Sequence, residues 1–332
     1  MEDTRYDVVG IGNAIVDIIG RCDDSFLVRH DLAKGFMRLI DAGQAEQLYS
    51  IMGPAIERSG GSAANTIAGL ASFGGRGAFI GRVAGDQFGK VFWHDIHAAG
   101  VAFETGYAVS GLPTAVCLIL VTPDGERTMN TFLGASTELG AAEVDPAMIA
   151  ASKVTYLEGY LFDKPEAKEA FRIAAGLAAN AGRKTALTLS DAFCVDRHRA
   201  DFRQLVQHDV DILFANEKEI TALFETNTFE EAVAAVRGVC DIAVLTRSEQ
   251  GSLIVTAGEA ITIPAHPVDK VVDVTGAGDL YAAGFLYGLT RSLPLEVCGR
   301  LGSLAAAEVI GHIGARPDVP LGTLARKAGL MV

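Results

Sequence analysis

The sequence predicts an α/β fold in which a doubly wound, mostly parallel sheet is flanked by helices. From about residue 154 onward, short β-rich runs alternate with segments of helical periodicity. The strand-like runs are apolar throughout, as expected when helices cover both faces of a parallel sheet. The chain shows no internal repeat of about 20 to 50 residues, so a solenoid is not expected.

After residue 154 the predicted elements follow one another closely. Strands are predicted at Val154–Glu158, Thr185–Leu189, Ile212–Ala215 and Ile242–Thr246, and helices at Pro165–Ala181, Glu217–Phe224 and Phe229–Val236. Two short runs, Leu253–Thr256 and Ile261–Ile263, are joined by Ala-Gly-Glu-Ala, which predicts a β-hairpin. Two long helices, Gly276–Leu289 and Leu295–Ile313, are predicted near the C-terminus.

The first 150 residues are less regular. A buried strand is predicted at Tyr6–Ile11 and a helix at Ser62–Phe73. Val116–Thr122 and Arg127–Phe132 flank the turn Pro-Asp-Gly and predict a second hairpin. Together with Gly35–Ile40, this hairpin indicates a small β-rich lid. We expect a single domain over residues 1–332, with the lid built from interleaved segments of about 14–50 and 105–135.

Composition narrows the function classes. The 28 Lys and Arg against 41 Asp and Glu give a net charge of −13, and such an excess of carboxylates repels nucleic-acid backbones. The longest apolar run, Ala115–Val121, is too short to cross a membrane, and the N-terminus does not read as a signal peptide. The five cysteines lack a C-x-x-C pair and predict reduced thiols rather than a disulfide frame or zinc site: Cys22, Cys117, Cys194, Cys240 and Cys298. We expect a cytoplasmic monomer or homodimer whose partners are small molecules, with no nucleic acid and no membrane.

The strongest chemical signal is Asp273-Val-Thr-Gly-Ala-Gly-Asp279, which follows a Val-rich strand and opens a helix. Gly276, Ala277 and Gly278 place small residues in the first helical turn, where unpaired N–H groups and the positive end of the helix dipole face outward. Such a turn forms an anion hole that a phosphoryl group can approach closely. Asp279 could accept a proton from a substrate hydroxyl there. The structural alternative is a tight turn whose acidic residue favours the helix dipole.

A second signal, Gly60-Gly61-Ser-Ala-Ala-Asn65, begins another predicted helix. The glycine pair lets backbone approach a ligand, and Asn65 offers both a donor and an acceptor one turn into the helix. The alternative is an ordinary helix start capped by Ser62. This motif alone favours neither reading.

Together the two motifs, Gly-Gly-x-x-x-Asn and Asp-x-Thr-Gly-Ala-Gly-Asp, resemble the ribokinase-like (PfkB) family of sugar and nucleoside kinases over nearly the whole chain. Three more segments make the chain most similar to the adenosine kinase branch: Gly12-Asn13-Ala-Ile-Val-Asp17-Ile, Leu189-Ser-Asp-Ala-Phe193 and Asp211-Ile-Leu-Phe-Ala-Asn-Glu-Lys-Glu219. The resemblance implies transfer of a phosphoryl group from ATP, with Mg²⁺, to a primary hydroxyl. The expected acceptor is the 5′-hydroxyl of adenosine, giving AMP.

The resemblance also implies residue roles on the acceptor side. Asp279 would be the general base and Gly276–Gly278 the anion hole. The ribose hydroxyls would be held by Asp17, Gly61 and Asn65, with Asn13 nearby. A carboxylate can accept from two vicinal hydroxyls, which suits Asp17, although Asp is also common in turns. Phe193 would flank the purine with help from Tyr160, whereas most Phe side chains simply fill the core.

On the nucleotide side, Asn216-Glu-Lys-Glu219 matches an Asn-x-x-Glu element that organises Mg²⁺ through water. The same spacing is typical of a helix capping box. Thr246-Arg-Ser-Glu-Gln-Gly251 resembles the nucleotide loop, with Thr246 and Gly251 as binding residues, but Ser248 stands where many relatives have Gly.

Two further assignments concern charges around the phosphates. Asp273 and Thr275 match positions that bind a monovalent cation such as K⁺ in many relatives, and a capped turn is the alternative. Arg127, beyond the hairpin turn, resembles the lid arginine that reaches the transferring phosphate. The alternative for Arg127 is an ordinary solvated side chain.

Other functions compete with this reading. Val8-Val-Gly-Ile-Gly12 resembles part of a dinucleotide-binding fingerprint, but position 15 is Ile and the following residues continue as a strand. A non-catalytic nucleotide sensor would be expected to lack the base or the anion hole, yet both are present. Within the family, the alternatives are a ribose- or fructose-type sugar kinase and an inosine or guanosine kinase.

Overall fold

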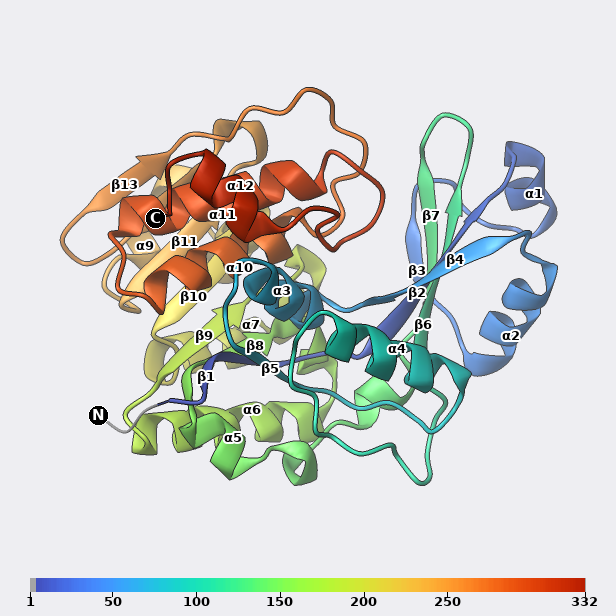
Figure 1. Ribbon diagram of the computed structural model, residues 1–332, viewed down its shortest axis with the longest axis horizontal. Helices are drawn as coiled ribbons and strands as arrows, with labels where there is room; N and C mark the ends of the chain where they lie inside the picture. Colours follow the sequence, from blue (N-terminus) through green and yellow to red (C-terminus); the bar gives the residue numbers. More distant parts are fainter. Residues whose placement is uncertain (1–3, 332) are drawn as a thin grey trace.

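The computed structural model describes residues 4–331, which form two β-sheets and the helices around them (Figure 1). The strands are β1 (Tyr6–Ile11), β2 (Ile15–Arg21), β3 (Met37–Leu39), β4 (Ala55–Gly60), β5 (Gly77–Ile80), β6 (Ala115–Val121), β7 (Arg127–Phe132), β8 (Ser152–Glu158), β9 (Lys184–Thr188), β10 (Ile212–Asn216), β11 (Ile242–Thr246), β12 (Ser252–Val255) and β13 (Ala260–Ile263). The α-helices are α1 (Asp24–Arg29), α2 (Ala42–Ile51), α3 (Ser62–Ser72), α4 (Gln87–Ala98), α5 (Pro146–Ala150), α6 (Pro165–Asn180), α7 (Ala192–His208), α8 (Glu217–Phe224), α9 (Phe229–Val236), α10 (Ala277–Leu289), α11 (Leu295–Val309) and α12 (Leu321–Lys327).

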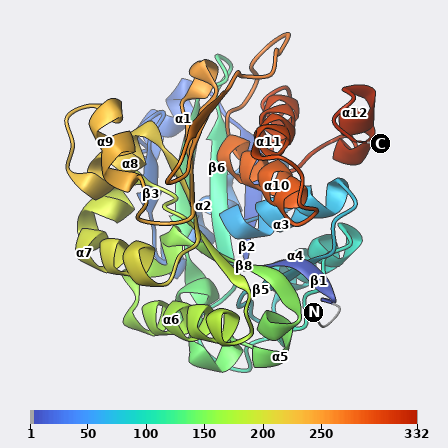
Figure 2. The ribbon, with the colours of Figure 1, turned by 90° about the vertical axis from the view of Figure 1, so that its left-hand side faces the viewer.

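The larger sheet has eight strands in the order β13-β12-β11-β10-β9-β8-β1-β5. Strands β5, β1, β8, β9, β10 and β11 run parallel, and β12 and β13 add an antiparallel edge. Helices α6 to α9 lie on one side of this sheet, and α3, α10 and α11 on the other (Figure 2). Both faces of a strand are therefore buried: Val8 joins the core beneath α3 and α10, while its neighbour Val9 joins the core beneath α6 and α7. The predicted fold class is confirmed.

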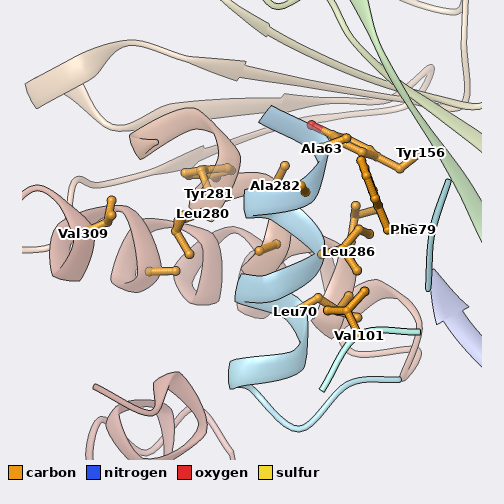
Figure 3. Packing of buried hydrophobic residues seen from close by; sticks show 14 of the residues in the cluster. Ala63, Leu70, Phe79, Val101, Tyr156, Leu280, Tyr281, Ala282, Leu286 and Val309 are labelled. Carbon is orange, nitrogen blue, oxygen red and sulfur yellow. The ribbon is translucent and has the colours of Figure 1, made fainter. Parts of the chain in front are cut away.

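Helices α3 and α10 pack closely against each other, and this contact brings both N-termini to the same place. A side chain at Gly69 in α3 would lie 2.6 Å from Leu280 Cδ1 in α10, so glycine allows the close approach. Figure 3 shows Leu70 of α3 near Leu286 of α10, and Leu280, further along α10, belongs to the same apolar cluster. The two motifs singled out in the sequence open these two helices.

The smaller sheet has the order β3-β7-β6-β2-β4 and stands beside the larger one (Figure 1). The predicted hairpin is present as β6 and β7, with Val121 opposite Arg127. Because side chains alternate along a strand, Asp17, Cys117 and Thr131 share one face, and Ile18 and Leu118 share the other. The second face packs against α1 and α2, which leaves the first face free to line a site.

Two sequence predictions need correction, and several elements were not predicted. The lid segment of about 14–50 was too short, because β4 at Ala55–Gly60 pairs with β2 in the smaller sheet. The helix predicted at Leu295–Ile313 ends at Val309, because Gly311 and Gly314 follow and the chain turns back towards α10. Strand β5 and helices α4 and α7 were not predicted. None of the helices within residues 4–331 is long and apolar enough to cross a membrane.

Candidate active site

A cavity of about 920 Å³ lies where the carboxyl ends of the parallel strands meet the smaller sheet. The last residues of β8, β10 and β11, namely Glu158, Asn216 and Thr246, line one side. Asp17 and Thr131 of the smaller sheet line the other. The carboxyl edge is the usual ligand position in open α/β sheets. The same topology therefore gathers residues that are far apart in the sequence.

Most of the predicted site residues line this cavity: Asn13, Asp17, Gly61, Asn65, Tyr160, Phe193, Asn216, Glu219, Thr246, Thr275, Gly276, Ala277, Gly278 and Asp279. Arg127 and Asp273 lie just behind its wall and reach it through Thr275. Gly251 lies outside it, at the tight turn that leads into β12.

Asp279 lies in the first turn of α10 and is held by two donors from α3. Its Oδ1 accepts from Ser62 Oγ at 2.6 Å, and its Oδ2 accepts from Asn65 Nδ2 at 3.1 Å. Burial raises the pKa of Asp279 to about 6, and these two hydrogen bonds limit the rise. A carboxylate with this pKa is ionised at neutral pH and still basic enough to accept a proton.

Each helix start has a glycine that the surroundings require. Gly276 caps α10 with φ of 81°, and a side chain there would lie 2.8 Å from the Ala315 backbone. Gly61 caps α3 with φ of 96°, and a side chain there would collide with the carbonyl oxygen of Asn13. Neither glycine has a side chain that could cap its helix. The Ala63 N–H of α3 donates to Glu158, and the Ala277 N–H of α10 donates to the Val274 carbonyl oxygen. Among the described residues, the Gly278 and Asp279 N–H groups have no such partner and stay open to a ligand. The alternative in which Ser62 caps α3 is wrong, because its hydroxyl donates to Asp279 instead.

Glu158 is a site residue that the sequence analysis missed. Its side chain is buried at the end of β8 and accepts from Asn13 Nδ2 at 2.5 Å and from the Ala63 backbone N–H at 2.8 Å. Burial raises the pKa of Glu158 to about 7, against these hydrogen bonds. Glu158 thereby ties the turn after β1 to the start of α3. The sequence signal that could have identified Glu158 is an acidic residue at the end of a mostly apolar strand.

Asp17 lies on the cavity face of β2. Burial raises the pKa of Asp17 to about 7, while the positive charges of Arg316 and Arg127 oppose that rise. Arg316 was also missed by the sequence analysis. Its Nε donates to Asn65 Oδ1 at 3.3 Å.

The nucleotide-side residues show local structural roles. Asn216 and Glu219 form a complete capping box for α8, with the Glu219 N–H donating to Asn216 Oδ1 at 2.9 Å. Burial raises the pKa of Glu219 to about 7, and its side chain also lines the cavity. Ser248 has φ of 51°, in the left-handed region that favours glycine, which accounts for the glycine expected at this position.

Arg127 projects from β7 and forms an ion pair with Asp273. The distance from Arg127 Nη2 to Asp273 Oδ2 is 2.7 Å, and Arg127 Nη1 donates to Thr275 Oγ1 at 3.2 Å. The other Asp273 oxygen accepts from Thr275, and the Gly314 N–H donates to Oδ2. A guanidinium therefore already neutralises the acid predicted to bind a monovalent cation. In this arrangement Asp273 and Thr275 do not fit a K⁺ ion, and Arg127 is not solvated.

Three aromatic side chains line the cavity. Phe193, at the start of α7, is 75% exposed, and Phe36, just before β3, is 70% exposed. Tyr160 lies in a short 3-10 helix after β8. Exposed aromatic rings that face a cavity suit a flat, apolar ligand group.

The family follows from a direct comparison. The model of the pfkB family of carbohydrate kinases matches residues 56–321, most of the chain. The chain belongs to the PfkB family. It is 55% identical to adenosine kinase from Sinorhizobium meliloti, whose crystal structure superposes with a TM-score of 0.91 over 98% of this chain and 99% of the other.

More distant relatives in the PfkB family act on different acceptors. Adenosine kinase from Saccharomyces cerevisiae is 27% identical over 94% of this chain and 96% of its own length. Fructokinase from Salmonella typhimurium is 26% identical over 79% of this chain and 87% of its own length. The chain is thus an ATP-dependent kinase that transfers a phosphoryl group to a sugar or nucleoside.

A PfkB kinase uses ATP, and its Mg²⁺ arrives with the nucleotide. Within the part of the chain that the structure describes, no group of three or more His, Cys, Asp and Glu side chains could hold a metal ion by itself. Glu219 keeps free lone pairs on both carboxylate oxygens beside the cavity, so it fits a water-mediated contact with Mg²⁺.

Proposed function

We propose that this PfkB kinase transfers the terminal phosphoryl group of MgATP to the 5′-hydroxyl of adenosine. The observation that carries the proposal is the composition of a single cavity. Asp279 lies at the glycine-capped start of α10, Asp17 lines the same cavity from the smaller sheet, and Phe193 contributes an aromatic ring to its lining. A free sugar has no flat apolar group for such a ring to contact.

In this proposal Asp279 accepts the proton of the 5′-hydroxyl as the hydroxyl oxygen attacks phosphorus. The anion hole at Gly276, Ala277 and Gly278 stabilises the negative charge on the transferring group through the open N–H groups and the positive end of the α10 dipole, although the Ala277 N–H itself donates to the Val274 carbonyl oxygen. Asp17 and Asn65 hold the ribose hydroxyls, with Asn13 and Gly61 shaping the wall behind them. Phe193 and Tyr160 contact the purine.

The nucleotide would bind at the edge formed by Thr246 and Gly251. When bound with the nucleotide, Mg²⁺ would supply positive charge that offsets the charge of the phosphates. Glu219, oriented by Asn216, would position the water that links the ion to the protein. Arg127 would reach the transferring phosphate after leaving Asp273. The similarity to adenosine kinases at high coverage supports the acceptor assignment.

The test is a panel of acceptors with the purified enzyme. ADP release is measured with adenosine, inosine, guanosine, ribose and fructose at matched MgATP. We expect kcat/KM for adenosine to exceed every other value by at least about tenfold. The aromatic lining favours a nucleoside over ribose or fructose, and the similarity to adenosine kinases favours adenosine over inosine and guanosine. The Asp279→Asn variant shows how much ADP comes from background hydrolysis.

Each other outcome assigns a different function. A preference for ribose or fructose would make the chain a sugar kinase, as the fructokinase relative allows. A preference for inosine or guanosine would keep the nucleoside class and change the base.

A further inference from the structure

Arg316, in the loop between α11 and α12, is connected to the base by a chain of two hydrogen bonds. Arg316 Nε donates to Asn65 Oδ1 at 3.3 Å, and Asn65 Nδ2 donates to Asp279 Oδ2 at 3.1 Å. These three residues come from separate elements: the loop, α3 and α10. Asn65 is buried between the other two. The Asn65 side-chain amide therefore makes both hydrogen bonds of this path, one to Arg316 and one to Asp279.

The chemistry of the two end groups fixes the orientation of that amide. A guanidinium only donates hydrogen bonds, and an ionised carboxylate only accepts them. The amide oxygen of Asn65 must then face Arg316 and its NH₂ group must face Asp279. A flipped amide would aim its oxygen at the Asp279 carboxylate, which is tolerable only if Asp279 is protonated. A protonated Asp279 cannot accept a proton from the substrate.

We propose that Arg316 is a positioning residue for phosphoryl transfer: it orients the Asn65 amide so that Asp279 stays ionised and correctly aimed. The proposal rests on the proposed role of Asp279 as the base. It does not depend on which acceptor the enzyme prefers.

The loop that carries Arg316 is itself fixed against the same helix start. The Gly314 N–H donates to Asp273 Oδ2 at 3.0 Å, and Ala315 packs against Gly276, the cap of α10. These contacts hold Arg316 at a set distance from Asn65. Only glycine fits at position 276 because the loop lies so close.

The environment of Arg316 costs stability, which points to a role beyond packing. Burial lowers the pKa of Arg316 to about 10, so the group is still a cation at neutral pH. Within the described residues, its Nη2 is buried and has no hydrogen-bond partner. Arg316 is half-buried, and a buried donor atom such as its Nη2 is destabilising when it is left without a partner. The acids Asp95 and Asp17 offset part of that cost.

Other charged groups also face Asp279, so the experiment must isolate the contribution of Arg316. The groups around Asp279 are Asp17 on β2, Glu158 on β8, Glu219 on α8, and the pair of Arg127 with Asp273. A simple loss of positive charge would act on all of them. An effect transmitted through Asn65 would disappear when Asn65 is removed.

The test is a double-mutant cycle with Arg316→Ala, Asn65→Ala and the double variant, assayed with the best acceptor from the panel. We expect each single variant to lower kcat by about tenfold or more, because the base is misaligned. KM for ATP should stay within about twofold of the parent, since this path does not touch the nucleotide. The double variant should be no slower than the slower single variant, because both remove the same contact.

A pH profile gives the second readout. In Arg316→Ala the acid limb of kcat/KM should move to higher pH, whereas Arg316→Lys, which keeps a charge and donors, should restore part of kcat and the parent limb. Arg326→Ala, an exposed arginine on α12, is the matched control and should change neither. If Arg316→Ala does not fold, the pH profile of Arg316→Lys against Arg316→Gln decides in the same way.

The proposal is overturned by parent-like kcat in Arg316→Ala, or by effects of the two substitutions that multiply in the double variant. Loss of thermal stability with unchanged kcat and unchanged acid limb would leave Arg316 a structural residue. Failure of the proposed base is seen separately, because Asp279→Asn would then retain turnover.

Discussion

Asp279 is both ionised at neutral pH and basic enough to accept a proton, two properties that require opposite shifts of its pKa. A solvated carboxylate is ionised but too weak a base, whereas a fully desolvated one is protonated at neutral pH. Here burial raises the pKa to about 6, and the donors from Ser62 and Asn65 hold it there. An ordinary acidic side chain thereby acquires the pKa that the proposed role of general base requires.

We expect Asp279→Asn to lower turnover by about a hundredfold or more while leaving ATP binding and the melting temperature near the parent values. The amide keeps the shape of the carboxylate but cannot accept the proton. Turnover and ATP affinity are measured together with Asp269→Asn, an exposed acid in the loop before α10, as control.

The same substitution should change the pH dependence. In the parent enzyme kcat/KM should fall as pH drops through about 6, because protonated Asp279 cannot act as a base. The contribution of Asp279 to that limb should be absent from the residual activity of the variant, which keeps only the titration of Asp17 near its pKa of about 7. If the variant keeps more than about a third of parent turnover, far above the loss of a general base, Asp279 is not the base.

The sequence could identify Asp279 and Asn65 because each lies in a compact motif with its own spacing. It could not identify Ser62, Glu158 or Arg316 as partners of these residues. Ser62 lies 217 positions from Asp279, and Arg316 lies 251 positions from Asn65. Hydrogen bonds over such separations are created by folding, and they leave no pattern in a single sequence.

At the scale of elements, the β6–β7 hairpin determines where Arg127 can act. Arg127, Met129 and Thr131 alternate with residues of the opposite face, so all three point to the cavity side of the smaller sheet. Arg127 is paired with Asp273 in this structure. Any approach of Arg127 to a phosphate must therefore break that ion pair.

We expect the acceptor to bind first and to draw the hairpin towards the cavity, because a phosphoryl-transfer site works best when water is excluded. Hydrogen exchange over residues 116–132 should then slow when the acceptor is added. Arg127→Ala should lower kcat more than it raises the acceptor KM, since the charge acts on the transferring group. Lys34→Ala, which removes the exposed ion pairs near the hairpin tip, is the control and should leave kcat unchanged.

Unchanged exchange together with parent-like kcat in Arg127→Ala would show that the hairpin only packs against the site. If exchange slows when the acceptor is added but Arg127→Ala keeps parent-like kcat, the hairpin closes over the site and the charge of Arg127 does not contribute to the reaction.

Elements with a clear hydrophobic pattern in their own sequence were predicted well. Elements that form because they pair or pack with distant parts of the chain were not. Strands β1, β7 and β11 and helices α8 and α9 have the predicted bounds. Strand β4 was missed because its sequence, with Glu57 and Arg58 in the middle and Ala55 and Ile56 exposed, gives no apolar run. Helix α7 was missed because its polar sequence also contains a kink at His198. In both cases pairing or packing with distant elements outweighs the local signal.

At the scale of the whole molecule, the two sheets share one core. The same buried cluster contains Val8 and Phe79 of the larger sheet and Ile18 and Leu118 of the smaller one. Removing the smaller sheet would expose apolar surface on the remainder, at about 25 cal/mol for each Å². The two parts should therefore depend on each other for stability.

We expect thermal unfolding to be a single cooperative transition, with the same midpoint by calorimetry and by far-ultraviolet circular dichroism. Ile18→Ala, in the shared core, should lower that midpoint without splitting the transition, at a cost of about 2 to 5 kcal/mol. Val28→Ala, exposed on α1, is the control and should have little effect. Two resolved transitions would show that the smaller sheet is an independent domain.

The crowding of carboxyl groups in the cavity has a thermodynamic consequence for ligand binding. The pKa of Asp17 lies at about 7 and that of Asp279 at about 6, so near neutral pH the empty enzyme retains a fraction of a proton on them. Substrate hydroxyls that donate to these groups favour the ionised form, and the proton is expelled to the buffer. Titration calorimetry near pH 6.5 should then give a binding enthalpy that changes with the ionisation enthalpy of the buffer, and the dependence should vanish about two pH units higher. An enthalpy independent of the buffer at both pH values would mean that the acceptor binds without touching either acid.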